Sequence, residues 1–94
     1  MQPAPAVVHN PAASRFEAEV GGRLAVCVYR EQGGVLALTH TEVPPAAQGQ
    51  GVAAALVRET LAWARREHRL VRPQCSYVAS YMRRHPETRD LLAD

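Results

Sequence analysis

The stretch that decides the fold is HTEVPPAAQGQGVAA, residues 40–54, in which an extended segment gives way to a helix. Residues 35–43 alternate in the two-residue period of a strand, which Pro44 ends because proline cannot donate a hydrogen bond to a sheet ladder. Residues 51–67 then carry apolar side chains at helical spacing. Glycines at a helix start leave backbone amides open to a phosphate, although the same glycines also suit a plain turn with a helix cap. The stretch therefore predicts a strand, a turn that favours an anion, and a helix.

The alternation within residues 35–43 also predicts which side chains share a face of that strand. One side carries four residues: Leu36, Leu38, His40 and Glu42. We therefore expect the side chains of His40 and Glu42 to be neighbours. One inserted residue, a β-bulge, would change which of them faces a site at the end of the strand.

Two more strands are predicted on the N-terminal side. Residues 15–20 alternate as a half-buried strand does, and residues 24–30 are apolar on both faces, as in a central strand. Gly21-Gly22 and Gly33-Gly34 supply tight turns between the strands. These segments therefore predict an antiparallel three-strand meander.

The C-terminal side predicts one more strand and one more helix. Residues 70–75, which include Pro73, favour a short fourth strand near one edge of the sheet, reached by a right-handed parallel crossover. Residues 76–84 predict a short helix, which ends before Pro86 because the residue preceding a proline avoids helical angles. The expected fold class is therefore α/β (α+β), with a meander, one crossover helix, a short strand and a C-terminal helix.

Length and composition bound the domain and its partners. The 94 residues are 47% hydrophobic and 21% charged, which suits a single folded domain. Residues 1–13 contain three prolines and no periodicity, so we expect a flexible leader there and the domain over residues 14–94. The net charge of +2 and the absence of a long apolar run in the sequence argue against nucleic acid or a membrane as a partner.

The types of basic residue and the cysteines narrow the chemistry further. All 11 basic residues are arginines, which excludes a Schiff-base lysine and a Walker-A lysine. Cys27 and Cys75 are too far apart for a C-x-x-C motif, and the N-terminal residues lack the pattern of a signal peptide. We therefore expect a cytoplasmic protein with free thiols and no metal.

A dinucleotide site is a competing interpretation of the glycine-rich turn. Gly49, Gly51 and Ala54 fit the pattern G-x-G-x-x-A. That fingerprint needs a parallel sheet and an acidic residue about 20 positions further on. The sequence predicts an antiparallel meander instead, and the segment near Leu70 is not acidic. We therefore set this interpretation aside.

The motifs resemble a known family. HTEVPP at residues 40–45 followed by QGQGVA at residues 48–53 is similar to the acetyl-CoA signature of the GNAT N-acetyltransferase superfamily. Three later features resemble a small single-domain GNAT-like family of about this length: PQCSY at residues 73–77, Tyr81 and RHPE at residues 84–87. The resemblance runs from about Phe16 to Leu92 and implies a minimal GNAT-like fold.

The same resemblance implies a cofactor site. Acetyl-CoA would be the co-substrate, with its pantetheine arm along the strand and its thioester carbonyl polarised by the amide of Val43. The last strand would diverge from the signature strand and open a slot for the thioester. The residues implied to hold the pyrophosphate are Gln48, Gly49, Gln50, Gly51, Val52 and Ala53.

The candidates for catalysis are His40, Glu42, Cys75 and one tyrosine of the last helix. His40 and Glu42 lie beside the expected thioester, so either could take a proton from an acceptor amine, unless the pair is only solvated. Cys75 stands where a strand meets a helix N-terminus, which lowers the pKa of a thiol, and could carry the acetyl group or simply pack. Typical GNAT enzymes use a tyrosine acid in the last helix, a role that fits Tyr81 or Tyr77.

The sequence therefore predicts an acetyl-CoA-binding N-acetyltransferase that acts on a small-molecule or peptide amine. Two alternatives stay open, a CoA-binding module without turnover and a plain interaction domain. Nothing before Phe16 resembles the helices that build the acceptor pocket in larger GNAT proteins. We therefore expect an open acceptor groove or a partner chain that completes it, in a monomer or weak homodimer.

Overall fold

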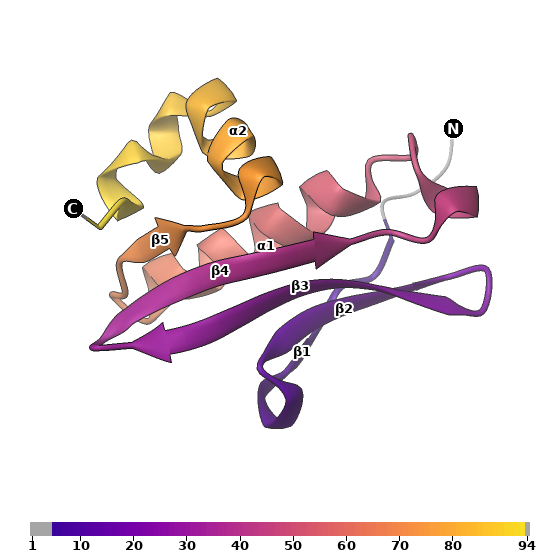
Figure 1. The fold of residues 1–94 in the computed structure, drawn as a ribbon, viewed down its shortest axis with the longest axis horizontal. Helices are drawn as coiled ribbons and strands as arrows, with labels where there is room; N and C mark the ends of the chain where they lie inside the picture. Colours follow the sequence, from indigo (N-terminus) through magenta and orange to yellow (C-terminus); the bar gives the residue numbers. More distant parts are fainter. Residues whose placement is uncertain (1–4, 94) are drawn as a thin grey trace.

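The computed structural model describes residues 5–93, which form a mixed α/β fold of one five-stranded sheet with helices packed against it (Figure 1). The elements along the chain are β1 (Val8–Asn10), η1 (Pro11–Ala13), β2 (Arg15–Val20), β3 (Arg23–Gln32), β4 (Val35–Glu42), η2 (Pro45–Ala47), α1 (Val52–Arg66), β5 (Val71–Pro73), α2 (Ser76–Arg84) and η3 (Pro86–Leu91).

The strands lie in the sheet in the same order as in the chain, β1-β2-β3-β4-β5. Strands β1 to β4 pair antiparallel, with η1 between β1 and β2 and tight turns between the others. Gly21 and Gly22, in the turn between β2 and β3, have φ values of 59° and 78°, which glycine adopts readily. After α1 the chain returns parallel to β4 as β5, at the edge of the sheet. The predicted meander, crossover helix and edge strand are confirmed.

The N-terminal segment corrects the prediction of a leader over residues 1–13. Residues 1–4 lie outside the described part, but Val8–Asn10 pairs with β2 as an additional edge strand. The His9 ring stacks on Phe16 at a centroid distance of 4.2 Å, and its Nε2 lies 2.6 Å from the hydroxyl oxygen of Tyr29. Three residues are too few to show a period, so the sequence pattern could not reveal this strand or the contacts of His9.

A bulge in β4 overturns the predicted side-chain alternation. Leu38 pairs with Tyr29 and His40 pairs with Val28, so Thr39 is an extra residue in β4. One extra residue moves all following side chains to the opposite face. Leu36 and Leu38 are therefore buried, whereas His40 and Glu42 are exposed on the other face of the sheet. The expectation that these four residues share one face is wrong.

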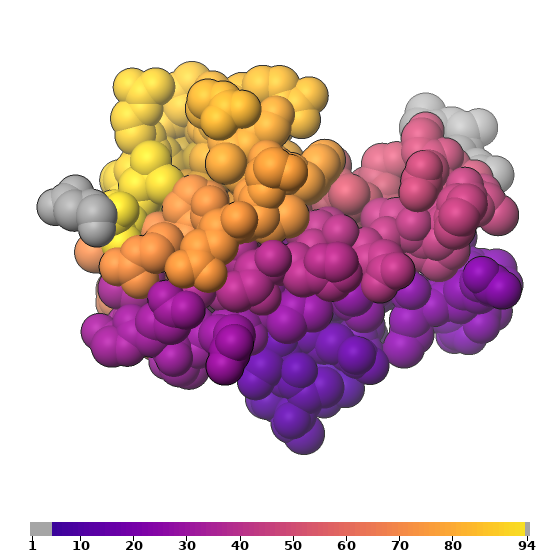
Figure 2. All heavy atoms as spheres, in the orientation of Figure 1, coloured from indigo at the N-terminus to yellow at the C-terminus, as the bar shows by residue number. Residues whose placement is uncertain are grey.

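The space-filling view shows how the elements rise from the sheet (Figure 2). The residues of α2 and η3, orange to yellow, form one projection, and the loop before α1, pink, forms another. The outline is hollowed between these two projections. This hollow lies where the sequence predicts an anion site.

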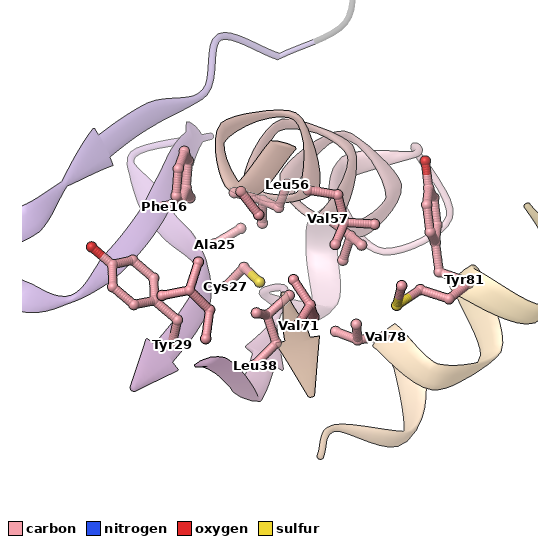
Figure 3. Packing of buried hydrophobic residues seen from close by; sticks show 14 of the residues in the cluster. Phe16, Ala25, Cys27, Tyr29, Leu38, Leu56, Val57, Val71, Val78 and Tyr81 are labelled. Carbon is pink, nitrogen blue, oxygen red and sulfur yellow. The ribbon is translucent and has the colours of Figure 1, made fainter. Parts of the chain in front are cut away.

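The hydrophobic core lies between the sheet and the two helices (Figure 3). Alternate residues of β2, β3 and β4 meet the apolar stripe of α1 and the inner side of α2. Fully buried members include Cys27, Leu38, Leu56, Val57, Val71 and Val78. On the other face of the sheet, Leu24 is 48% exposed, so no described helix covers this part of it.

The helices of residues 5–93 are surface helices. None of them is long and apolar enough to cross a membrane. The longest, α1, has 15 residues, whereas a membrane-spanning helix needs about 20 apolar residues. The stripe of α1 that faces the sheet is apolar, and arginines occupy its outer side.

Candidate functional site

A cavity of about 230 Å³ lies at the junction of β4, the following loop and α1. It is lined by Val43, Ala47, Gln48, Gly49, Gly51, Val52, Ala53, Ala54 and Tyr77. Six of the seven predicted cofactor residues are in this lining. The seventh, Gln50, lines a different hollow, and its side-chain amide lies 3.4 Å from the carbonyl oxygen of Ala46, to which it donates.

The backbone of the loop leaves room for a ligand above it. Gly49 and Gly51 have φ values of 82° and 78°, and a Cβ placed on either glycine would meet no atom within 4 Å. The N-terminus of α1 has no side-chain cap among the described residues. The Gln48 side chain donates to the carbonyl oxygen of Val43 at 3.1 Å and ties the loop to the end of β4. The amides at this helix start are therefore available to an anion, as a pyrophosphate requires.

Strands β4 and β5 diverge just before the cavity. Their pairing ends at Leu38 and Pro73, where the amides of Gln74 and Cys75 both donate to the carbonyl oxygen of Leu38, at 3.1 and 2.9 Å. Within the described residues, β4 continues to Glu42 without a partner on its β5 side. The divergence of these two strands, which the family resemblance implies, is therefore observed.

Cys75 stands at this divergence as the residue before the first turn of α2. Its thiol donates to the hydroxyl oxygen of Thr41, 3.6 Å away. Partial burial by itself raises the pKa of the Cys75 thiol, but hydrogen bonds from the backbone of Val78 and from the Thr41 side chain, with smaller ones from nearby amides, leave it lowered. This direction agrees with the lower pKa expected for a thiol at a helix N-terminus.

Thr41 is a site residue that the sequence pattern missed. Its hydroxyl accepts from Cys75 and donates to the sulfur of Cys27 at 4.0 Å. Cys27 is fully buried, and burial raises the pKa of its thiol, as expected for a core residue. Thr41 faces the core only because the bulge at Thr39 turns it inward. A single sequence carries no signal for that bulge.

His40 and Glu42 are neighbours, as predicted, with Nε2 and Oε1 3.5 Å apart. Their side chains are 59% and 71% exposed. They lie on the open face of the sheet, whereas Thr41 and Cys75 lie on the helix side. The structure therefore separates the imidazole–carboxylate pair from the thiol by the thickness of one strand.

The two tyrosines of α2 occupy different places. Tyr77 lines the loop cavity. Tyr81, one turn further on, is 6% exposed and lines a second hollow, where its ring stacks on His85 at 3.9 Å. Burial raises the pKa of Tyr81, so its hydroxyl stays protonated near neutral pH. Of the two candidate acids, Tyr77 lies at the loop cavity.

Comparisons with known proteins add one finding. A family model described as GCN5-related N-acetyl-transferase matches residues 15–91. The matched region runs from the start of β2 to the end of η3 and includes the loop cavity, Thr41 and Cys75. A comparison with curated proteins gives no match. Within residues 5–93, no three His, Cys, Asp or Glu side chains come together in a way that could hold a metal ion.

Proposed function

Because the chain belongs to the GCN5-related N-acetyltransferase family, we propose that it binds acetyl-CoA and transfers the acetyl group to an amine. The family supports acetyltransferase chemistry in general. The observation that carries the specific proposal is the open, uncapped loop cavity beside the place where β4 and β5 diverge.

The loop and α1 fit the pyrophosphate of CoA. The backbone amides of residues 49–53 lie at or just before the start of α1, where the helix dipole favours negative charge. The glycines allow close approach of a phosphate because they lack a side chain. The pantetheine arm would then follow the free edge of β4, which brings the thioester toward Thr41 and the amide of Val43.

The open face of the sheet suits a direct transfer to the amine. The amine nitrogen attacks the acetyl carbonyl, the new C–N bond forms, and the C–S bond breaks to release CoA as a thiolate. The proton lost by the amine goes to His40, directly or through a water, and Glu42 stabilises the imidazolium across the 3.5 Å contact. The exposure of both side chains suits an acceptor that approaches from solvent, such as a peptide amine or a small polyamine.

Cys75 offers a two-step route to the same product. Its thiolate would attack the thioester, form an acetyl-cysteine and release CoA, and the amine would then take the acetyl group. If this route operates, intact-mass spectrometry after treatment with acetyl-CoA shows one acetyl adduct that Cys75→Ser removes. An unchanged adduct in that variant excludes the two-step route and leaves the direct transfer.

A matched pair of glycine variants tests acetyl-CoA binding at the loop. Gly51→Ala and Gly34→Ala both place a side chain at a positive φ, 78° and 85°, with no atom in the way. Each should lose about 1–2 kcal/mol of folding stability. Isothermal titration calorimetry should show acetyl-CoA binding weakened about tenfold by Gly51→Ala alone. The absence of binding by the wild-type protein at millimolar acetyl-CoA would refute the proposal.

One observation favours a second candidate, a CoA-binding module without turnover. The His40–Glu42 pair and Cys75 lie on opposite faces of β4, so they do not form one catalytic group in this structure. A protein of this kind would bind acetyl-CoA at the same loop but acetylate none of a panel of amines. Acetyl transfer that His40→Ala reduces would exclude it.

A further inference from the structure

The open face of the sheet carries a pair of arginines beside the part of β4 that precedes the bulge. Arg30 of β3 pairs with Ala37 of β4, and Ala37 pairs with Arg72 of β5. Residues paired in neighbouring strands direct their side chains to the same face, so one alanine lies between two arginines. Adjacent strands are about 4.8 Å apart, which separates the two arginine backbones by about 10 Å. The two side chains are therefore close enough to contact one ligand group.

The burial of Ala37 indicates where these arginine side chains lie. Leu36 and Leu38 face the hydrophobic core, so Ala37 between them faces the other side of the sheet. Ala37 is nevertheless fully buried, although it lies outside that core. The side chains that flank it in this row are those of Arg30 and Arg72. Because arginine packs its hydrocarbon stem on apolar surface and keeps its charged end in water, both guanidinium groups are presented above one small residue.

Neither arginine of this pair is neutralised by a carboxylate within residues 5–93. Arg30 makes no ion pair there, and Arg72 donates to a neutral amide, the Oε1 of Gln32, at 3.3 Å. The nearby acid Glu31 pairs with Leu36 across the sheet and so lies on the helix side, where it forms an ion pair with Arg69. The two positive charges are therefore available to an anionic ligand.

The bulge at Thr39 brings His40 to the same face as these arginines. His40 and Ala37 are three residues apart, and in a regular strand they would point to opposite faces. On β3, the partner of His40 is two residues from Arg30, which is a distance of about 7 Å along the strand. Glu42 lies beyond His40, with its Oε1 3.5 Å from the ring nitrogen. The open face therefore presents, in order along β4, a carboxylate, an imidazole and a pair of guanidinium groups.

We propose that this face binds a zwitterionic acceptor, a small amine that also carries a carboxylate or a phosphate group. The anionic group contacts Arg30 and Arg72, because the arginine fork matches the oxygens of either anion. The ammonium group lies at His40, where the carboxylate of Glu42 attracts it. A diamine would place its second positive charge beside two unpaired guanidinium groups, which repel it. The proposal rests on the proposed function, since it names the acceptor of the same acetyl transfer.

Steady-state kinetics with amines of equal length test this assignment. The probes are ω-aminohexanoate, ω-aminohexanol and diaminohexane, which differ in the charge of one end. With saturating acetyl-CoA, we expect kcat/KM to be about tenfold higher for ω-aminohexanoate than for ω-aminohexanol, the size of a charge-assisted contact that is open to solvent. Diaminohexane should be the poorest acceptor. A comparison of ω-aminohexanoate with aminopentyl phosphate then shows which of the two anions is preferred.

The arginine variants separate anion binding from catalysis. Arg30→Ala and Arg72→Ala should each raise KM for ω-aminohexanoate and leave its kcat unchanged, because the contact is made equally before and during the reaction. Their kinetics with ω-aminohexanol should match those of the wild-type protein, which also shows that the variants are folded. Arg30→Lys should restore part of the preference. Arg66→Ala is the matched control, because Arg66 is an exposed arginine at the end of α1.

Each outcome bears on a stated claim. Equal kcat/KM of the wild-type protein for the three probes overturns the zwitterion assignment and leaves acetyl transfer intact. The same conclusion follows if Arg30→Ala and Arg72→Ala keep the preference, or if Arg66→Ala loses it to the same extent. Binding of acetyl-CoA without transfer to any of these amines overturns both the zwitterion assignment and the transferase activity.

Discussion

The hydroxyl of Thr41 should control the reactivity of Cys75. Thr41→Val keeps the branched shape of the side chain but removes the oxygen that lies 3.6 Å from the Cys75 sulfur. When Cys75 is a thiolate, that hydroxyl can turn to donate to it and stabilise the charge. In the native protein the hydrogen bond of the Thr41 side chain lowers the pKa of Cys75. The loss of the hydroxyl should therefore raise that pKa.

The size of the effect follows from the energy of one hydrogen bond. A net value of about 1 kcal/mol reduces the thiolate population about fivefold at a pH below the thiol pKa. The thiolate of the variant is more basic and therefore more nucleophilic. On a logarithmic scale this offsets nearly half of the decrease in rate that the smaller thiolate population causes. The rate of alkylation by iodoacetamide should therefore fall about twofold to threefold near neutral pH. At a pH well above both pKa values, where both thiols are fully ionised, the variant should react about twofold faster because its thiolate is more basic.

Mass spectrometry of the alkylated protein measures this rate at Cys75 alone, because Cys27 is fully buried. Thr41→Ser should restore the wild-type rate. Thr39→Val is the matched control, since Thr39 lies in the same strand and makes no hydrogen bond to Cys75 within the described structure. A Thr41→Val variant that folds normally and is alkylated at the wild-type rate at every pH would refute the reasoning.

Three further predictions concern His9, the hydrophobic core and the open face of the sheet. Burial lowers the pKa of His9 in the folded protein, so the neutral ring stabilises the fold at a pH above its pKa in the unfolded chain, about 6.5. This contribution is lost as the pH falls below that value, because the unfolded chain then binds a proton more readily. The melting temperature should therefore drop between pH 7 and pH 5, and it should drop less in His9→Phe. Leu38→Ala should reduce the free energy of unfolding by about 2–5 kcal/mol in urea titrations, whereas Leu24→Ala, at an exposed position, should change it little. His40→Ala should slow acetyl transfer about a hundredfold and Glu42→Gln less, with acetyl-CoA affinity unchanged in calorimetry.

Much of the fold could be predicted because strong local signals mark its elements. The helix at residues 76–84 has the predicted bounds, since Pro86 fixes its end. Strand β2 also matches, because six residues show a clear alternation. Most of the lining of the loop cavity could be predicted from the glycine-rich segment between β4 and α1, because those residues are adjacent in the sequence.

The features that escaped prediction depend on contacts between distant segments. The bulge at Thr39 reflects the register of β4 against β3, and it decides that Thr41 meets Cys75. Strand β1 depends on the contacts of His9 with Phe16 and a tyrosine about 20 residues away. The second hollow, beside Tyr81, requires the packing of α1 against α2 and η3. None of these leaves a periodic pattern in the chain.

The matching order of strands in the chain and in the sheet has a consequence for how the protein reaches its native state. Strands β2, β3 and β4 each pair with the strand that precedes them across a short connection, whereas the connection from β4 to β5 contains the whole of α1. Short loops close with little loss of entropy, and low contact order correlates with rapid folding. The hairpins of β2 to β4 can therefore form before the C-terminal third of the chain is in place. Helix α1, which covers the apolar side of these hairpins, then has a preformed surface on which to dock.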